Sequence, residues 1–240
     1  MSLAVSLIVV TVVAAAIRKP LKAAPWVFYL LSLLFAITAL YLTVSPVPNT
    51  LVRSIVYAVQ KGQVAFSLFA LVMFVGVFDT ESKVRSFLGP VRAELSISAT
   101  LLLCGHFPLY ASSYFGTGLQ VLARRPSVLA SLLIAAILCI LVALLAITSI
   151  NKVKRHMRSG TWKRLQALSY AFFALIYFHM LGYFIVPALE GSTTSAVNLG
   201  VYTAVFSAYV VLRIRKALRD RHLNILKCRD TETFRTHAQQ

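Results

Sequence analysis

Long apolar segments alternate with short polar segments along the whole chain. A helix needs about 20 apolar residues to cross a bilayer, so we predict a transmembrane helix for each segment of that kind. There are seven, at 3–17, 23–44, 62–78, 95–115, 126–150, 165–189 and 193–214. The pattern therefore predicts an all-α polytopic membrane helix bundle, in which the first span is the shortest.

Composition agrees with this pattern, and the charge adds an orientation. The chain is 59% hydrophobic, and its 24 Lys and Arg residues against 7 Asp and Glu give a formal net charge of +17. Most of these cations fall in alternate connections and after the last span, which is the positive-inside pattern. It predicts an N-terminus outside and a C-terminus inside. The charge then serves topology and attraction to anionic membrane lipid, and we expect no nucleic-acid binding.

The basic segment after the last span has its own pattern. Between residues 213 and 227, leucine and isoleucine side chains alternate with cations. This predicts an amphipathic helix that runs along the inner membrane surface.

Two histidines lie near the middle of predicted spans. His106 is about 16 Å into its span and His179 about 21 Å into its own, at 1.5 Å per residue. An imidazole at this depth is costly and is kept where something binds it. Two such rings on different helices can supply both axial ligands of one haem iron. The alternative is two buried histidines that hydrogen-bond across helices. Gly182, about one turn beyond His179, is expected to leave room for a flat macrocycle.

Other chemistry has less support in the sequence. Apart from Arg213 at an inner edge, no Asp, Glu, Lys or Arg lies within a predicted span, so an ion-coupled transporter has no relay. The three cysteines form no CxxC pair, which leaves redox or zinc chemistry unsupported. The remaining histidines lie in basic or polar segments and are expected at the surface: His156, His222 and His237.

A run of residues before His179 resembles a known family. Residues 161–170 read Thr-Trp-Lys-Arg-Leu-Gln-Ala-Leu-Ser-Tyr; an Arg-Ala-Glu-Leu run stands at 92–95 and an Arg-Pro pair at 125–126. Together they resemble the ferric-reductase-like transmembrane superfamily. Within it they are most similar to the haem-binding membrane subunit (MsrQ) of the bacterial periplasmic methionine sulfoxide reductase system. The resemblance covers roughly residues 62–214.

The resemblance implies one haem b, with His106 and His179 as its ligands, in a non-catalytic electron-transfer subunit of the bacterial inner membrane. Electrons would come from a quinol or an inner-side flavin reductase and pass to a periplasmic or extracellular oxidoreductase subunit. The family usually has histidine where this chain has Gln166, and its core has six spans, so the first predicted span is an addition. The implied domains are 1–61 with two N-terminal spans, a haem-binding core at 62–214 and a basic inner tail at 215–240.

Three further residues enter as candidate cofactor-binding residues. Arg92, Trp162 and Arg164 are expected at the inner face, where they could hold haem propionates, the phosphate of FMN or a quinone head group. The alternative is positive-inside anchoring with an interfacial tryptophan. We expect no flavin or nicotinamide domain after the last span. Two other functions stay open: a ferric or other metal reductase, and a haem-free membrane scaffold or transporter.

Overall fold

A computed structural model describes the backbone of residues 2–44, 49–117 and 125–237, and the side chains of these residues except 115–117 and 223–237. Every regular element in those ranges is a helix, which confirms the predicted all-α polytopic membrane bundle. The helices are α1 (Leu3–Ala23), α2 (Pro25–Tyr41), α3 (Thr50–Gln60), α4 (Gln63–Val77), α5 (Lys83–Leu88), the 3₁₀ turn η1 (Gly89–Val91), α6 (Arg92–Thr117), α8 (Pro126–Ser149), α9 (Asn151–His156), α10 (Ser159–Leu189) and α11 (Thr193–His237).

Fewer than seven of the described helices reach the usual length of a membrane span. Five described helices are long and apolar enough to cross a membrane, and α3 with α4 gives a sixth when this bent pair is counted as one. The remaining predicted span, α2, has 17 residues. At 1.5 Å per residue it is about 26 Å long, shorter than a hydrocarbon core of about 30 Å. All seven apolar segments are helical, and α2, with 17 residues, is at the lower limit of about 17 residues for a helix that crosses a bilayer.

The helix α4 lies at the centre of the bundle and packs against α1, α3, α6 and α11. Its side chains enter two separate apolar clusters: Leu68 and Phe69 belong to one with residues of α1, α6, α8 and α10, whereas Phe66 and Met73 belong to one with residues of α10 and α11. In the second cluster, aromatic rings of the three helices meet edge to face. A helix that is apolar on all sides is suited to this buried position.

The helix α3 was not predicted, because its apolar residues occupy one face only. The side chain of Asn49 caps its first turn by accepting from the N–H groups of Leu51 and Val52. The chain then bends by 61° before α4. Gly62 sits at the bend with φ 69°, a left-handed conformation that glycine adopts at little cost.

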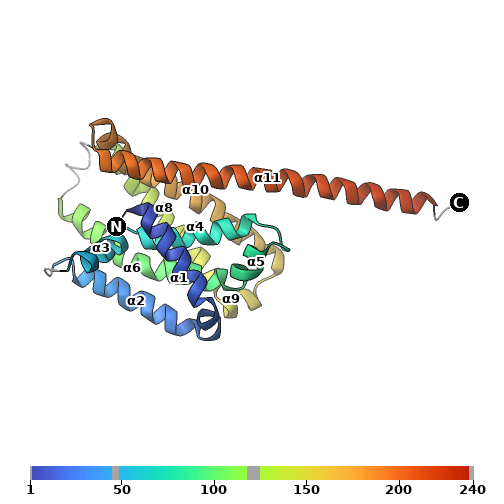
Figure 1. Ribbon diagram of the computed structural model, residues 1–240, viewed down its shortest axis with the longest axis horizontal. Helices are drawn as coiled ribbons and strands as arrows, with labels where there is room; N and C mark the ends of the chain where they lie inside the picture. The colour runs from blue at the N-terminus through green and yellow to red at the C-terminus, as the bar shows by residue number, and fades with distance from the viewer. Residues whose placement is uncertain (1, 45–48, 118–124, 238–240) are drawn as a thin grey trace.

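The helix α11 contradicts the predicted amphipathic surface helix. It runs without a break from Thr193 to His237, first along the bundle and then well beyond it (Figure 1). No glycine or proline stands between residues 201 and 237, so the chain has no helix stop at the membrane edge. The basic segment therefore extends the last span and does not fold back along the bundle.

Candidate functional site

His106 lies on α6 beside the bend between α3 and α4. Its Nδ1 atom is 2.7 Å from the backbone oxygen of Gln60, and its ring lies beside Gly62, where an added Cβ would be 3.4 Å away. Gln60 is the last residue of α3, so its carbonyl has no partner within that helix. The interruption of the helix thus provides the acceptor that orients the ring.

Two contacts hold this part of α3 and α6 against α2. The Gln60 Nε2 atom donates to the Ala39 oxygen at 2.7 Å and lies 2.9 Å from the Thr43 hydroxyl oxygen. One residue before His106, a Cβ added to Gly105 would stand 2.7 Å from the Ala36 oxygen. The missing side chain at Gly105 therefore lets α6 approach α2 closely. This close approach fixes the position of the neighbouring His106 backbone.

His179 lies on α10 and faces the continuous helix α8. Its Nδ1 atom is 2.9 Å from the Ser131 backbone oxygen, and the Ser131 hydroxyl donates in return to the His179 oxygen at 3.2 Å. A Cβ on Gly182 would lie 1.9 Å from the Ser131 hydroxyl oxygen. Gly182 therefore permits close packing of α8 on α10. The expectation that it leaves room for a macrocycle is wrong, since Ser131 fills that space.

The two imidazoles share one hydrogen-bond arrangement. Each Nδ1 faces a backbone carbonyl, which can only accept, so each Nδ1 carries the proton and each Nε2 keeps its lone pair. Among the described residues neither Nε2 has a hydrogen-bond partner. Both Nε2 atoms are also absent from the fully buried polar atoms that lack a partner, so each keeps some accessible surface. Metal-binding histidines usually show this arrangement, with the second ring nitrogen bound to a carbonyl.

Tyrosines line the region of the two histidines. The Tyr110 ring centroid is 4.8 Å from that of His106, and the Tyr183 centroid is 5.2 Å from that of His179. Tyr114 and Tyr183 connect the two sides, with centroids 6.3 Å apart. The helices α6 and α10 belong to different halves of the bundle, because α6 packs mainly on α2 and α4 and α10 mainly on α8 and α11. Each half thus presents one imidazole whose Nε2 has no hydrogen-bond partner among the described residues, and imidazole nitrogen is the ligand type that haem iron takes in axial positions.

The alternative interpretation, two histidines that hydrogen-bond between helices, agrees with part of the geometry. Both Nδ1 bonds cross from one element to another and satisfy one polar atom of each ring, of which His179 is buried and His106 half-buried. They leave the Nε2 atoms unexplained. No group of three or more His, Cys, Asp or Glu in the described part of the chain could hold a metal ion by protein ligands alone.

The three inner-face candidates do not share one pocket. Arg92 donates from Nε to the Val72 oxygen at 3.1 Å and lines a pocket between α4, α6 and α11. Trp162 donates to the Thr148 oxygen at 3.0 Å, and the Lys154 ammonium lies 4.4 Å from its ring. Arg164 is exposed on α10. Neither Trp162 nor Arg164 lines the Arg92 pocket.

The Gln166 side chain joins α10 to α8 by a hydrogen bond. It does not contact the Gln60 or Ser131 carbonyls that the two imidazoles bind. Its Nε2 atom is 3.0 Å from the Thr148 hydroxyl oxygen, next to the Trp162 bond to the same residue. The surface histidines are as expected where they are described: His156 and His222 are exposed, and the prediction for His237 lies outside the described side chains.

Gln60 and Ser131 provide the two imidazole acceptors, and neither residue was predicted from the sequence. The available signal was a polar residue at the edge of, or within, an apolar run. Serine and glutamine side chains in membrane helices usually bond to a neighbouring helix, as both do here. Their backbone carbonyls carry no sequence signal, so the acceptors themselves could not be predicted.

Comparison with known proteins adds one relative. No family model matches the chain, and no solved structure matches it. It is similar to a protein of Treponema pallidum (strain Nichols) described as an uncharacterized protein, with 31% identity over 227 residues. The match covers 92% of this chain and 62% of that protein, so the chain spans less than two thirds of the relative's length.

Proposed function

We propose that this chain is a membrane electron-transfer subunit that binds one haem b through His106 and His179. One observation carries the proposal: two imidazoles on α6 and α10 have Nδ1 bound to a backbone carbonyl and Nε2 free. A purely structural histidine needs no such shared arrangement. Haem iron held by two neutral imidazoles is a one-electron carrier.

The protein's own part in this function is to fix the two ligands. The Gln60 carbonyl sets the tautomer and direction of His106, and the Ser131 carbonyl does the same for His179. Both rings lie in a largely apolar bundle, which would limit access of water to a bound haem iron. Arg92, Trp162 and Arg164 lie toward the opposite end, about 20 Å along the helices from the histidines, so they stay candidates for FMN phosphate or quinone binding and not for the propionates of this haem.

The direction of transfer follows from the charge pattern and from depth. With the N-terminus outside and the C-terminus inside, the α3–α4 bend lies toward the outside, and His106 lies beside it. We place the chain in a bacterial inner membrane. Its donor is a quinol or an inner-side flavin reductase, and its acceptor is an outer-side oxidoreductase. Resemblance favours a methionine sulfoxide reductase catalytic subunit; a ferric or other metal reductase is the alternative.

Absorption spectra of the detergent-purified protein, oxidised and reduced with dithionite, test the cofactor. We expect a low-spin b-type spectrum with about one haem per chain. His106→Ala and His179→Ala should each lose most of it. His156→Ala is the matched control, because His156 is exposed and bonds only to the Lys152 oxygen of its own helix. Full haem retention in both site variants, or no haem in the wild type with ample haem supply, would reject the proposal.

The acceptor is tested by reoxidation of the reduced protein. The methionine sulfoxide reductase catalytic subunit of the same bacterium, with methionine sulfoxide, should restore the oxidised spectrum within seconds. A ferric chelate should act much more slowly. The reverse order would assign the chain to the metal reductases.

A further inference from the structure

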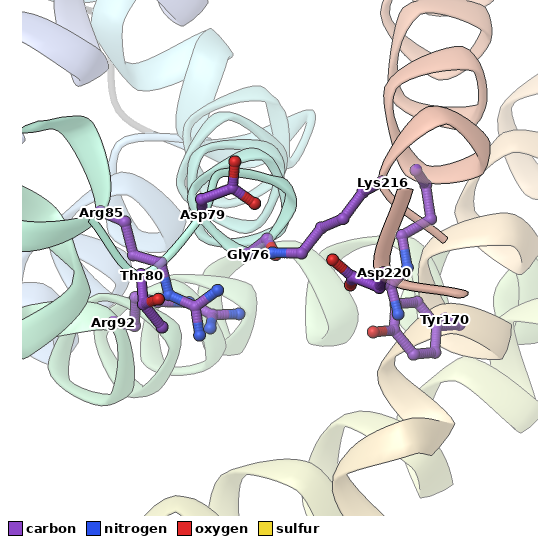
Figure 2. A pocket seen from close by; sticks show the side chains of 9 residues that line it. Gly76, Asp79, Thr80, Arg85, Arg92, Tyr170, Lys216 and Asp220 are labelled. Atoms are coloured by element: carbon purple, nitrogen blue, oxygen red, sulfur yellow. The ribbon is translucent and has the colours of Figure 1, made fainter. Parts of the chain in front are cut away.

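A second polar region lies at the opposite end of α4 from the histidines. The 15 residues of α4 separate the two regions by about 20 Å. A pocket of about 440 Å³ opens there, where α4, α6, α10 and α11 meet (Figure 2). Its lining contains four cations, Arg85, Arg92, Arg213 and Lys216, and two carboxylates, Asp79 and Asp220.

Two of the cations are fixed by the C-terminal end of α4. Lys216 reaches across from α11 and donates from Nζ to the Phe78 oxygen at 2.7 Å and to the Gly76 oxygen at 3.2 Å. Arg85 donates to the same Phe78 oxygen at 2.9 Å. Cations suit the negative end of a helix, so these bonds position the side chains before any ligand arrives.

The fixed arginines retain free donors. A guanidinium has five N–H donors; Arg92 uses its Nε on the Val72 oxygen, and Arg85 uses one terminal nitrogen on the Phe78 oxygen. Arg213 is held by its ring contact with Tyr170, at 4.7 Å from the centroid. Gly76 keeps the pocket open, because a Cβ there would stand 3.1 Å from an Arg92 terminal nitrogen.

The charges of the pocket are not balanced by the protein. Within the described ranges, the one ion pair closer than 4 Å joins Asp79 to Arg219, which is outside the lining. No lining cation therefore has a carboxylate within 4 Å, although Lys216 is only 8% exposed. Gathered like charges repel one another and favour binding of an anion.

We propose that this pocket binds a phosphate group, carried by a lipid head group or present as a free anion. Several oxygens of one phosphate can accept from two arginines and a lysine together, which a single carboxylate cannot do as well. The volume admits a phosphate with attached atoms. The basic loops place this end at the inner face, where anionic lipid is concentrated. The proposal does not depend on haem.

Binding of short-chain phosphatidylglycerol to the full detergent-purified chain tests the site, with phosphatidylcholine as the uncharged-head control. We expect saturable binding of phosphatidylglycerol and an affinity at least tenfold lower in Arg213→Gln and Arg92→Gln. Among the described residues Arg213 has no hydrogen bond to α4, and its contact is with the Tyr170 ring, so its variant keeps the helix end intact. Arg164→Gln removes an exposed cation outside the pocket and should change affinity less than twofold.

Inorganic phosphate separates the two sources. If it binds and displaces the lipid at millimolar concentration, the site serves a free phosphate; if the lipid binds and phosphate does not compete, the site serves a head group. Either result supports phosphate binding in this pocket, provided that affinity also falls in Arg213→Gln and Arg92→Gln. Equal losses of affinity in Arg164→Gln and Arg213→Gln would show a general attraction of the anion to basic residues and would overturn the proposal. Absence of saturable binding of either phosphatidylglycerol or phosphate would also overturn it.

Discussion

The two histidines reach the same hydrogen-bond arrangement by different means. His106 binds a carbonyl that is free because α3 ends at Gln60, and the left-handed Gly62 makes that end possible. His179 binds a carbonyl in the second turn of α8, which can accept a second bond because an oxygen has two lone pairs. The first support is a break in one helix, and the second is close packing of two unbroken helices.

This difference determines which changes should disturb each ring. The His179 support depends on the distance between α8 and α10, so added volume should disrupt it. The His106 support depends on a backbone conformation, so substitutions that oppose a positive φ should disrupt it. Substitutions that add volume beside Ser131 and substitutions at the positive-φ glycine therefore separate the two kinds of support.

The largest effect is expected from Gly182→Leu. A Cβ at this position would already be 1.9 Å from the Ser131 hydroxyl oxygen and 2.9 Å from the Ser127 backbone oxygen. The two helices must separate, and we expect the free energy of unfolding to fall by about 3 kcal/mol. Unfolding in mixed micelles measures this change. Gly200→Leu is the control, since nothing lies within 4 Å of a Cβ there. Equal stability of the two variants would contradict close packing at Gly182.

Gly62→Leu tests the broken-helix support. A leucine at φ 69° should cost about 1–2 kcal/mol of stability, and its side chain would meet the His106 ring. Gly191→Leu is the matched control: φ is 93° there, but a Cβ has no neighbour within 4 Å. Both variants should melt at lower temperature, whereas only Gly62→Leu should also reduce haem content. If both keep full haem, the bend does not orient His106.

These two glycines show how far the sequence predicts the site. The apolar pattern located both histidine helices, because burial in lipid follows directly from composition. Gly62 stands before an apolar segment and was taken as the start of a span, since nothing in the pattern separates a bend from a loop. Gly182 was expected to face a cofactor, because the sequence of α10 does not say which of its faces meets α8. Partner faces depend on packing between distant segments, and one sequence does not contain that information.

The basic pocket illustrates the same limit. The cations were predicted at the inner face from their spacing, and Arg92 does line the pocket. Its neighbours Arg213 and Lys216 come from a helix more than 100 residues later. The sequence placed that segment along the membrane surface, so the pocket could not be predicted.

Gln60→Leu should have an intermediate effect on the broken-helix support. It removes the donor to the Ala39 oxygen and to the Thr43 hydroxyl but keeps the carbonyl that faces His106. We expect a loss of about 1 kcal/mol, measured by unfolding in mixed micelles, with most haem retained. Gln63→Leu is the control, because the Gln63 Oε1 is buried without a partner in the described part of the chain. The Gln63→Leu variant should be as stable as the wild type or more stable. A larger loss of stability than in Gln60→Leu would contradict the stabilising role of the Gln60 side-chain bonds.

Ser131→Ala should have the smallest effect and separates the hydroxyl from the carbonyl. It removes the bond to the His179 oxygen but leaves the carbonyl that faces Nδ1, so we expect a loss of about 0.6 kcal/mol and unchanged haem content. Ser112→Ala, whose hydroxyl donates within α6 to the Leu109 oxygen, serves as the control.

A double variant then connects this serine to Gly182. In Gly182→Ala the new methyl group meets the Ser131 hydroxyl, so adding Ser131→Ala should recover about 1 kcal/mol of the loss. Recovery should be incomplete, because the Ser127 oxygen would still be 2.9 Å from the methyl group. Strict additivity would mean that α8 and α10 shift apart freely at this point. In that case close packing of these helices could not be what holds His179 in place.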